Sequence, residues 1–245
     1  MTRHPRAGTS DRRGPEDTAG PEQRRGVSDR PATAARTFDP GCRDCARLAG
    51  FLLSVRADNP GYHCAPVPPF GDPGARLLIV GLAPGMHGAN RTGRPFTGDH
   101  AGILLYQSLH RFGFSTAPES VARDDGLRLI DCRITNAVKC LPPLNKPLPE
   151  EIRRCNRYLA GEIHALAGHS SALVLALGLI AHQAVIRALG AKRSAYPFGH
   201  GAEHRLGHLR LLDSYHCSRH NTQTGRLTPA MLEAVLGRAR VLLGP

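Results

Sequence analysis

The 245-residue chain contains no tryptophan and only three methionines, and aromatic residues make up 5% of it. Lysine is equally scarce: Lys139, Lys146 and Lys192 are the only lysines among 32 basic residues. No stretch of the sequence approaches the roughly 20 apolar residues that a membrane-spanning helix requires. We therefore expect a soluble protein without membrane contact, in which arginine supplies nearly all of the positive charge.

The charge of the chain is strongly unbalanced. Its formal net charge is +12 and its pI is about 10.1. Arginine is well suited to bidentate contacts with phosphate, and such contacts supply most of the sequence-independent affinity of proteins for nucleic acids. The composition therefore favours a polyanionic partner, although a basic solubilising surface has the same signature.

The first 37 residues differ in composition from the rest. They are rich in Arg, Gly, Pro, Ser, Thr and Asp and almost lack large apolar side chains, so they cannot offset the entropy lost on ordering. We expect a disordered basic tail at 1–37, followed by one domain at 38–245. No apolar leader precedes the cysteines, and an odd number of cysteines indicates a reducing compartment, so we expect a cytoplasmic monomer.

Short apolar runs alternate with amphipathic stretches from residue 76 onward, which is the pattern of a parallel sheet covered by helices. This predicts an α/β fold with a central four-stranded parallel sheet flanked by helices. Strands are expected at 76–82, 133–138, 172–177 and 209–214. Helices are expected at 46–55, 100–112, 149–167, 179–189 and 229–243.

A glycine-rich segment, Gly81–Asp99, lies between the first expected strand and the following helix. Open α/β sheets bind ligands at the carboxyl ends of their strands, where such a loop brings backbone N–H groups close to a substrate. The segment matches neither the dinucleotide nor the P-loop spacing of glycines. It therefore marks a candidate site without indicating a nucleotide cofactor.

Four of the seven cysteines have an order that is typical of a metal centre. Cys42 and Cys45 form a CxxC pair, Cys140 follows an expected strand, and Cys155 lies in an expected helix. No strand precedes the pair, which argues against a thioredoxin-like redox site. Because structural zinc usually takes two close pairs, the pattern favours an iron-sulfur cluster, with zinc or free thiols as alternatives.

Three stretches of the chain, at 81–99, 135–147 and 214–228, resemble the motifs of the uracil-DNA glycosylase superfamily, and within it family 5. The resemblance runs from about Cys42 to the C-terminus. It implies a base-excision repair enzyme that removes uracil, with other deaminated bases as further candidate substrates, and leaves an abasic site. It also implies a 4Fe-4S cluster on the four cysteines, double- or single-stranded DNA as partner, and an association with the bacterial nucleoid.

The resemblance assigns roles to residues in these stretches. His216 would stabilise the departing base, with Asp99 and Asn145 handling the attacking water. Phe96 would stack on the extruded base, and Asn136 would read its edge. The remaining candidates are Gly85 and His87 for the pocket, and Asn90, Arg91, Arg219 and Arg226 for DNA.

Alternatives remain open at several of these positions. Asp99 directly precedes a helix and is also suited to be its N-cap. Leu82 stands where family 4 enzymes have an acidic residue, which disfavours that family, whereas Asn136 is closer to the family 4 pattern. The segment 219–226 is expected to be a polar loop that contacts DNA. A non-catalytic iron-sulfur DNA-binding protein on the same fold is the second functional class.

Overall fold

The structure is a computed structural model that describes residues 1–2, 35–166, 168–169 and 171–244. The tail expected at 1–37 lies almost wholly outside the described residues. Where the description resumes, the Arg36 N–H donates to the carbonyl oxygen of Arg157 at 3.1 Å. The Phe38 ring then meets the Tyr158 ring edge-on, with centroids 6.0 Å apart. The chain is therefore fastened to the folded domain from Arg36 onward.

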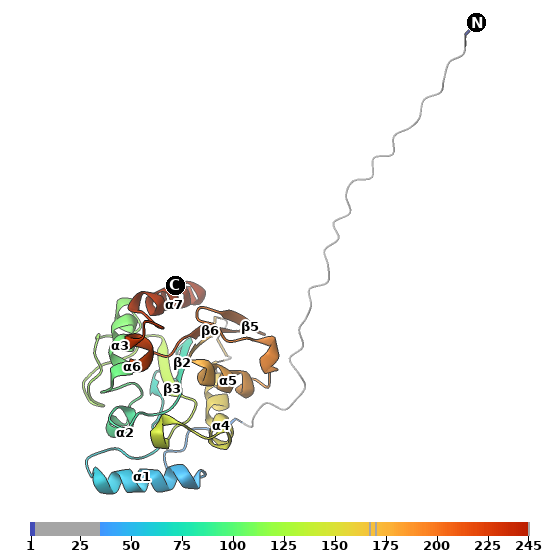
Figure 1. Cartoon of the computed structure of the whole chain (residues 1–245). Helices are drawn as coiled ribbons and strands as arrows, with labels where there is room; N and C mark the ends of the chain where they lie inside the picture. The colour runs from blue at the N-terminus through green and yellow to red at the C-terminus, as the bar shows by residue number, and fades with distance from the viewer. Residues whose placement is uncertain (3–34, 167, 170, 245) are drawn as a thin grey trace.

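Six strands form one sheet in the order β1-β3-β2-β4-β6-β5 (Figure 1). The four inner strands are parallel, as the sequence predicts, and the two edge strands run antiparallel to their neighbours. The expected count of four strands is therefore corrected to six. The strands are β1 (Phe70–Gly71), β2 (Leu77–Gly81), β3 (Cys132–Asn136), β4 (Leu173–Leu177), β5 (Glu203–Leu206) and β6 (Leu209–Ser214).

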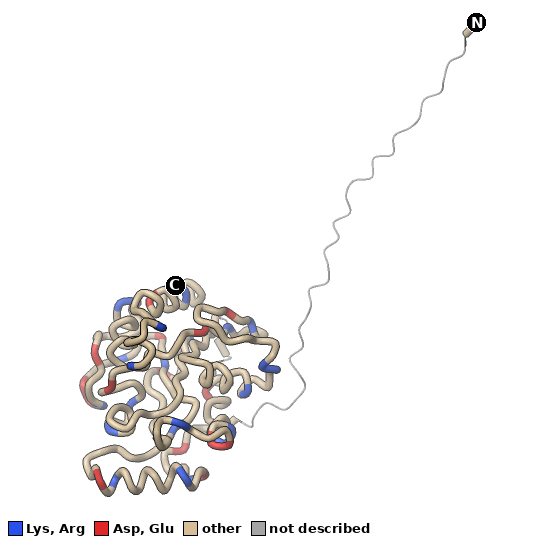
Figure 2. The backbone as a smooth tube through the Cα atoms, viewed as in Figure 1, with Lys and Arg blue, Asp and Glu red and all other residues tan. Residues whose placement is uncertain are grey.

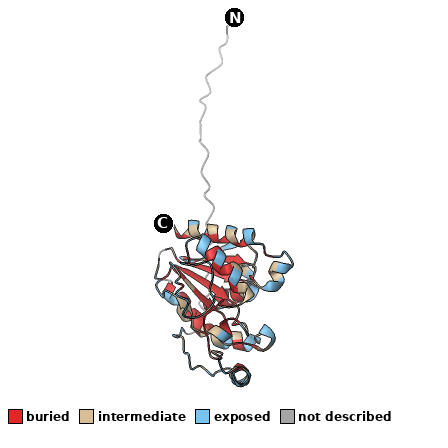
Figure 3. Ribbon diagram, turned by 90° about the vertical axis from the view of Figure 1, so that its left-hand side faces the viewer, coloured by how far each residue is buried: buried red, intermediate tan, exposed pale blue. Residues whose placement is uncertain are grey.

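The inner strands are apolar on both faces, as strands covered by helices on both sides must be. Leu77 and Ile79 of β2 belong to one buried cluster, and Leu78 and Val80, which point the opposite way, belong to another. Figure 3 shows these buried strands between two helical layers. The sheet therefore has a core on each face.

The helices that form these layers agree with the sequence prediction in place and type. One face is covered by α3 (His100–Arg111) and α7 (Pro229–Leu243), and the other by α4 (Pro149–Leu166) and α5 (Leu179–Ala188). The remaining long helix, α1 (Ala46–Asp58), lies at the lower edge of the view in Figure 1 and packs on its own small apolar cluster. None of the described helices is both long and apolar enough to span a bilayer.

Four short elements were not expected from the sequence: α2 (Ala89–Thr92), η1 (Pro143–Asn145), η2 (Arg193–Ala195) and α6 (Arg219–Gln223). The helix α6 replaces the first half of the loop expected at 219–226. Ser218 begins it by accepting the Asn221 N–H on its side-chain oxygen. No residue of α6 is buried, so the helix leaves no apolar periodicity in the sequence.

Arg94 fastens the glycine-rich loop to the segment that follows α3. Its Nη1 and Nη2 donate to Oδ1 of Asp125 at 2.8 and 2.9 Å, and Nη1 also donates to Ser120 Oγ at 2.9 Å. The arginine side chain is 3% exposed and lies over the Phe70 ring, 4.5 Å from its centroid. We refer to these contacts of Arg94 with Asp125 and Ser120 as the Arg94 clamp. Phe96 follows Arg94 by two residues, so the clamp holds the part of the loop that lies against the edge of the sheet.

We expect Asp125→Ala to lower the free energy of unfolding by about 3 to 5 kcal/mol, because it leaves the buried Arg94 guanidinium without its counter-ion. Urea denaturation would measure the change. The neighbouring Asp124 is exposed and makes no ion pair among the described residues, so Asp124→Ala is the control and should stay within about 0.5 kcal/mol of the parent. Equal losses for the two variants would contradict the clamp.

Candidate active site

A cavity opens at the edge of the sheet where the parallel strands end. The loop after β2, the end of β3 and the segment after β6 all contribute to its wall, as expected for an open α/β sheet. It encloses about 1090 Å³, including the part open to solvent. Its lining residues are Leu82, Ala83, Gly85, Ala89, Phe96, Asp99, His100, Ala101, Asn136, Asn145, His216, Ser218 and Arg219.

Gly81, at the end of β2, allows two of the candidate residues to approach the strand. It pairs in register with Asn136 of β3. A Cβ at position 81 would lie 2.4 Å from Oδ1 of Asn136 and 2.6 Å from Cζ of Phe96. Any side chain there would therefore displace both residues. Phe96 itself has a φ of +52°, in the left-handed region that non-glycine residues rarely adopt, at a cost of roughly 1 to 3 kcal/mol.

Phe96 and His216 place two rings side by side at the cavity. Their centroids are 5.9 Å apart and the ring planes differ by 32°. Phe96 is 6% exposed, and Tyr106 supports its loop by donating from its hydroxyl to the carbonyl oxygen of Pro95 at 3.1 Å. The aromatic ring is thus held rigidly against the space that a planar ligand would occupy.

Asn136 ends β3 with its amide turned to the cavity. The residue is 4% exposed, and its Oδ1 is buried without a hydrogen-bond partner. A buried polar atom without a hydrogen-bond partner costs free energy unless a ligand or a water molecule supplies the hydrogen bond. Because an amide carries both acceptor and donor atoms, Asn136 is prepared to pair with the polar edge of a ligand.

His216 follows β6 and is half-buried at the cavity wall. Burial lowers the pKa of its imidazole to about 4, so the ring is neutral at pH 7. The Asn221 side chain fixes the backbone by donating from Nδ2 to the carbonyl oxygen of His216 at 2.8 Å. Among the described residues, neither ring nitrogen has a hydrogen-bond partner. A neutral ring in this state can donate one N–H into the cavity.

Asp99 is the N-cap of α3, as its position in the sequence indicates. Its Oδ1 accepts the Gly102 N–H at 2.9 Å. Its Oδ2 points toward the glycine-rich loop, 2.2 Å from where a Cβ on Gly88 would lie and 3.4 Å from that of Gly85. Burial raises the pKa of the Asp99 carboxyl, while the backbone N–H groups of the helix start oppose that rise. One oxygen therefore caps the helix, and the carboxyl also lines the cavity.

Asn145 reaches the cavity from the turn η1. It is exposed and has a φ of +56°, and Leu144 before it has a φ of +54°. Leu144 is 86% exposed, which is unusual for a large apolar side chain in a strained turn. The sequence pattern does not single out Leu144, because an isolated leucine in a proline-rich loop gives no periodic signal.

The candidates for DNA contact have different positions. Arg219 lines the cavity, and Arg226 is exposed with its guanidinium 4.7 Å above the centroid of the Tyr215 ring. Arg91 is exposed and its Nε donates to the carbonyl oxygen of His87 at 2.8 Å. His87, which was expected at the pocket rather than at DNA, is exposed, and its Nδ1 is 2.9 Å from the Tyr62 hydroxyl; it is not among the described residues that line the cavity.

Asn90 is the exception among these candidates. It is 0% exposed, and its Nδ2 donates to Cys64 Sγ at 3.5 Å beneath the glycine-rich loop. A residue in this position cannot touch a phosphate at the surface, so its expected contact with DNA is corrected to a role in packing the loop. The basic residues of the described chain as a whole are spread over many elements (Figure 2).

The four cysteines singled out by the sequence converge away from this cavity. Cys42, Cys45, Cys140 and Cys155 line one space between α1, α4 and the segment after β3. Burial raises the pKa of the Cys155 thiol to about 11. It also raises the pKa of Cys140, with smaller contributions from the other three thiols. Buried thiols such as Cys140 and Cys155 would lose their protons together only against a strong positive charge, which a metal centre would supply.

Four cysteine thiolates are the ligand set of both a structural zinc ion and an iron-sulfur cluster, so the lining of this space fits either centre.

Comparison with known proteins agrees with this geometry. Residues 68–240 match the uracil DNA glycosylase superfamily. A type-5 uracil-DNA glycosylase of Thermus thermophilus is 49% identical over 209 residues, which cover 83% of this chain and 94% of that protein. One from Mycobacterium tuberculosis is 46% identical over 212 residues, covering 83% and 78%.

Type-4 enzymes match less of the chain. The type-4 uracil-DNA glycosylase of Pyrobaculum aerophilum is 37% identical over 130 residues, which cover 53% of this chain and 57% of that protein. The type-5 matches thus cover a larger part of this chain than the type-4 match does. The chain therefore belongs to the uracil-DNA glycosylase superfamily, in its type-5 branch.

Proposed function

We propose that the protein excises uracil from DNA by hydrolysing the N-glycosidic bond, leaving an abasic site. The observation that carries this proposal is the buried, unpartnered amide oxygen of Asn136, which faces a cavity walled by Phe96 and His216. A base must leave the duplex before an enzyme can act on it, and it is then held by stacking and by hydrogen bonds to its edge. The type-5 relatives are named for the same activity.

Base recognition follows from Asn136 and Phe96. The uracil edge has one N–H donor between two carbonyl acceptors, so the Oδ1 of Asn136 would accept the N–H while its Nδ2 donates to a carbonyl. The Phe96 ring, fixed by its clamped loop, would stack on the flat face of the base. Because Oδ1 is already desolvated in the free protein, pairing with uracil removes an existing penalty, and a base without that N–H would leave it in place.

Bond cleavage leaves negative charge on the departing base. A donor aimed at that charge is stabilising only if it is held in place beforehand in a site sheltered from water. His216 meets this condition, because its backbone is fixed by Asn221 and its neutral ring has an N–H available. A neutral imidazole acting as an electrophile is an established arrangement in other enzymes.

Water attack at the sugar carbon requires a group that orients the water and stabilises the positive charge developing on the sugar. Among the described residues that line the cavity, Asp99 is the only one with a carboxylate. Burial raises the pKa of this carboxyl, which makes its ionised form a better base than an exposed aspartate. Asn145 also lines the cavity and is a further polar group that can hold the water.

DNA binding would use Arg219, Arg226 and Arg91, which are exposed around the cavity and on the adjoining loop. The net charge of +12 supports the same partner, since phosphate neutralisation provides most of the affinity. The enzyme would act as a monomer, on chromosomal DNA in the bacterial nucleoid.

The four cysteines would hold a 4Fe-4S cluster, a proposal supported by their convergence on one space and by the order of the four residues in the sequence. When bound, such a cluster would serve here as a cross-link between segments. Two donors of the chain already contact these sulfur atoms: the Lys139 N–H donates to Cys155 Sγ at 3.3 Å, and Arg157 Nη2 donates to Cys42 Sγ at 3.7 Å. Such contacts from neighbouring groups orient the ligands of a metal centre.

Two substitutions separate the capping and catalytic roles of Asp99. Asp99→Asn preserves a good N-cap, so we expect the melting temperature to change little and single-turnover excision to fall about 10²- to 10⁴-fold. Asp99→Ala should lose the same activity and, in addition, about 0.5 to 2 kcal/mol of stability. Normal excision by Asp99→Asn would remove the carboxylate from the mechanism.

The parent protein and the Asp99→Asn variant should also differ in how the rate of excision depends on pH. Excision by the parent should decline as pH falls through the raised pKa of Asp99, because the protonated carboxyl cannot polarise water. His216 contributes no decline above about pH 5, since its pKa is near 4. Asp99→Asn should therefore show a flat profile from pH 5 to 8, measured by single-turnover assays on a uracil oligonucleotide.

The cluster proposal predicts about four irons per chain and a brown protein with broad visible absorption after anaerobic purification. Cys155→Ser should lose most of the iron and the colour. Cys132→Ala is the control, because Cys132 is buried in the core of β3 and does not line the thiol site. A colourless parent protein with one zinc per chain would refute the assignment.

The exposure of Leu144 leads us to expect that its substitution slows excision from duplex DNA but not from single-stranded DNA. An exposed apolar side chain at the rim can fill the space in the base stack that an extruded nucleotide leaves, as apolar wedges do in other DNA-binding proteins. Leu144→Ala should slow excision from duplex DNA on the order of ten-fold and leave excision from single strands nearly unchanged. Leu53→Ala, which removes an exposed leucine from α1, is the matched control, and equal slowing on both substrates would rule out the wedge.

A further inference from the structure

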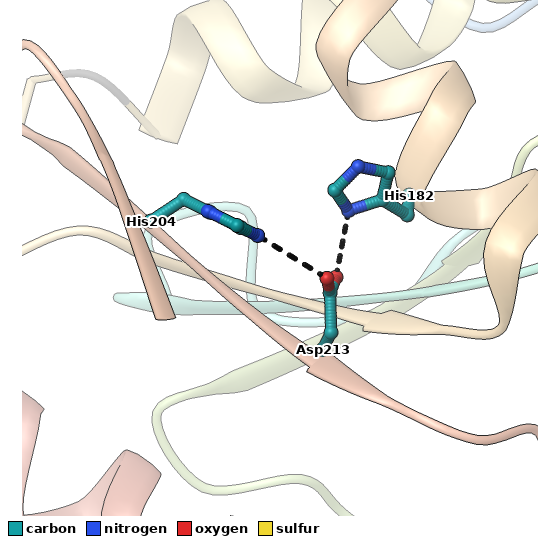
Figure 4. Close-up of side chains that lie close together, drawn as sticks. All are labelled: His182, His204 and Asp213. Atoms are coloured by element: carbon teal, nitrogen blue, oxygen red, sulfur yellow. Dashed lines mark hydrogen bonds and ion pairs between the residues drawn. The ribbon is translucent and has the colours of Figure 1, made fainter. Parts of the chain in front are cut away.

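A second group of chemically active side chains lies outside the cavity, where α5 meets the edge of the sheet. His182 of α5, His204 of β5 and Asp213 of β6 point toward one another (Figure 4). His182 Nδ1 is 2.9 Å from Asp213 Oδ1, and His204 Nε2 is 3.5 Å from Asp213 Oδ2. One candidate ligand atom from each residue lies within 4.8 Å of the other two.

The group is buried and incompletely satisfied. The side chains of His182, His204 and Asp213 are 2%, 12% and 0% exposed. His204 Nε2 and Asp213 Oδ2 both lack a hydrogen-bond partner. Buried polar atoms are nearly always paired, so these two unpaired atoms, which face each other, are suited to bind a common ligand.

The hydrogen bonds of the His182 ring show which of its two nitrogen atoms is available to a metal ion. Its Nε2 is 2.9 Å from the carbonyl oxygen of Tyr196, which can only accept, so Nε2 must carry a proton. Its Nδ1 faces the carboxylate of Asp213, also an acceptor. Without an ion, one proton between Nδ1 and the carboxylate forms a buried histidine–aspartate hydrogen bond. With an ion, Nδ1 offers its lone pair to the metal while Nε2–H bonds the carbonyl.

The second arrangement is the usual one for a histidine ligand, which donates its other N–H to a carbonyl or carboxylate that fixes the tautomer. It also gives a partner to His204 Nε2 and to Oδ2 of Asp213, which the hydrogen bond between His182 and Asp213 leaves unpaired. The surroundings provide no other compensation. Among the described residues, neither Arg nor Lys forms an ion pair with Asp213, and the rings of Tyr196 and Phe198 pack against the two histidines.

We propose that His182, His204 and Asp213 bind one divalent transition-metal ion of the zinc class. Two imidazoles and a carboxylate form the borderline nitrogen and oxygen ligand set that Zn²⁺ favours, with the second carboxylate oxygen or a water completing the coordination. The ion would tie α5 to the β5–β6 hairpin. Asp213 lies three residues before His216, so the metal would fasten the end of the strand that leads to that histidine.

The test uses the whole protein as purified, without removal of any iron that it holds. After treatment with a chelator such as dipicolinate, the protein is reloaded with Zn²⁺, and zinc content, melting temperature and Zn K-edge X-ray absorption are measured. We expect about one zinc per chain and a melting temperature that rises with free zinc, because the ligand binds only the folded state. The absorption spectrum should show nitrogen and oxygen neighbours at about 2.0 to 2.1 Å and no sulfur at about 2.3 Å.

Variants assign the zinc to these residues. His204→Gln and Asp213→Asn should lose the bound zinc and the zinc-dependent rise in melting temperature. His208→Gln is the matched control, because His208 is exposed in the turn of the same hairpin, and it should behave like the parent. The parent protein alone keeps the test decisive if Asp213→Asn does not fold.

Three results would overturn the proposal. They are a parent protein that retains no zinc and shows no thermal shift, a zinc spectrum dominated by sulfur, which would place the ion on the cysteines, and zinc binding by His204→Gln equal to that of the parent. None of these readouts depends on uracil excision, so the metal site and the proposed activity stand or fall separately.

Discussion

The absence of a side chain at Gly81 is the constraint on which the cavity depends. The strand end must let Phe96 and Asn136 approach to distances at which a Cβ would overlap both. Phe96 occupies that place only with a left-handed backbone, and the Arg94 clamp and the Tyr106 hydroxyl hold the loop in this conformation. The rigidity of the stacking surface is therefore maintained from outside the cavity, by contacts that never touch the ligand.

The sequence predicts the parts of the fold that are governed by apolar periodicity. The inner strands and the long helices are buried on one or both faces, so their side chains carry the signal that places them. The edge strands do not: β1 has two residues and β5 reads Glu-His-Arg-Leu, with only Leu206 buried. The helix α6 is likewise polar throughout, and its start depends on the Ser218 cap rather than on burial.

The residues of the candidate site also divide into those that a sequence pattern indicates and those that only the fold places. The positions of Phe96, Asn136, Asp99 and His216 follow from motifs at strand ends, and the structure gathers all four around one cavity. Asn90 could not be placed from sequence, because a polar residue in a glycine-rich loop is ordinarily exposed and only the fold buries it against Cys64. Leu144 was missed for the opposite reason, since its exposure and positive φ are properties of the folded turn.

The placement of the four thiols has a consequence for biosynthesis. Cys42 and Cys45 leave the ribosome more than 100 residues ahead of Cys155, a delay of roughly 5 to 20 seconds at bacterial rates of about 5 to 20 residues per second. During that interval the early pair has neither Cys140 nor the helix bearing Cys155 to close around it, and both thiols are open to oxidants in the cell. Assembly of this corner of the molecule is therefore a late event in the synthesis of the chain.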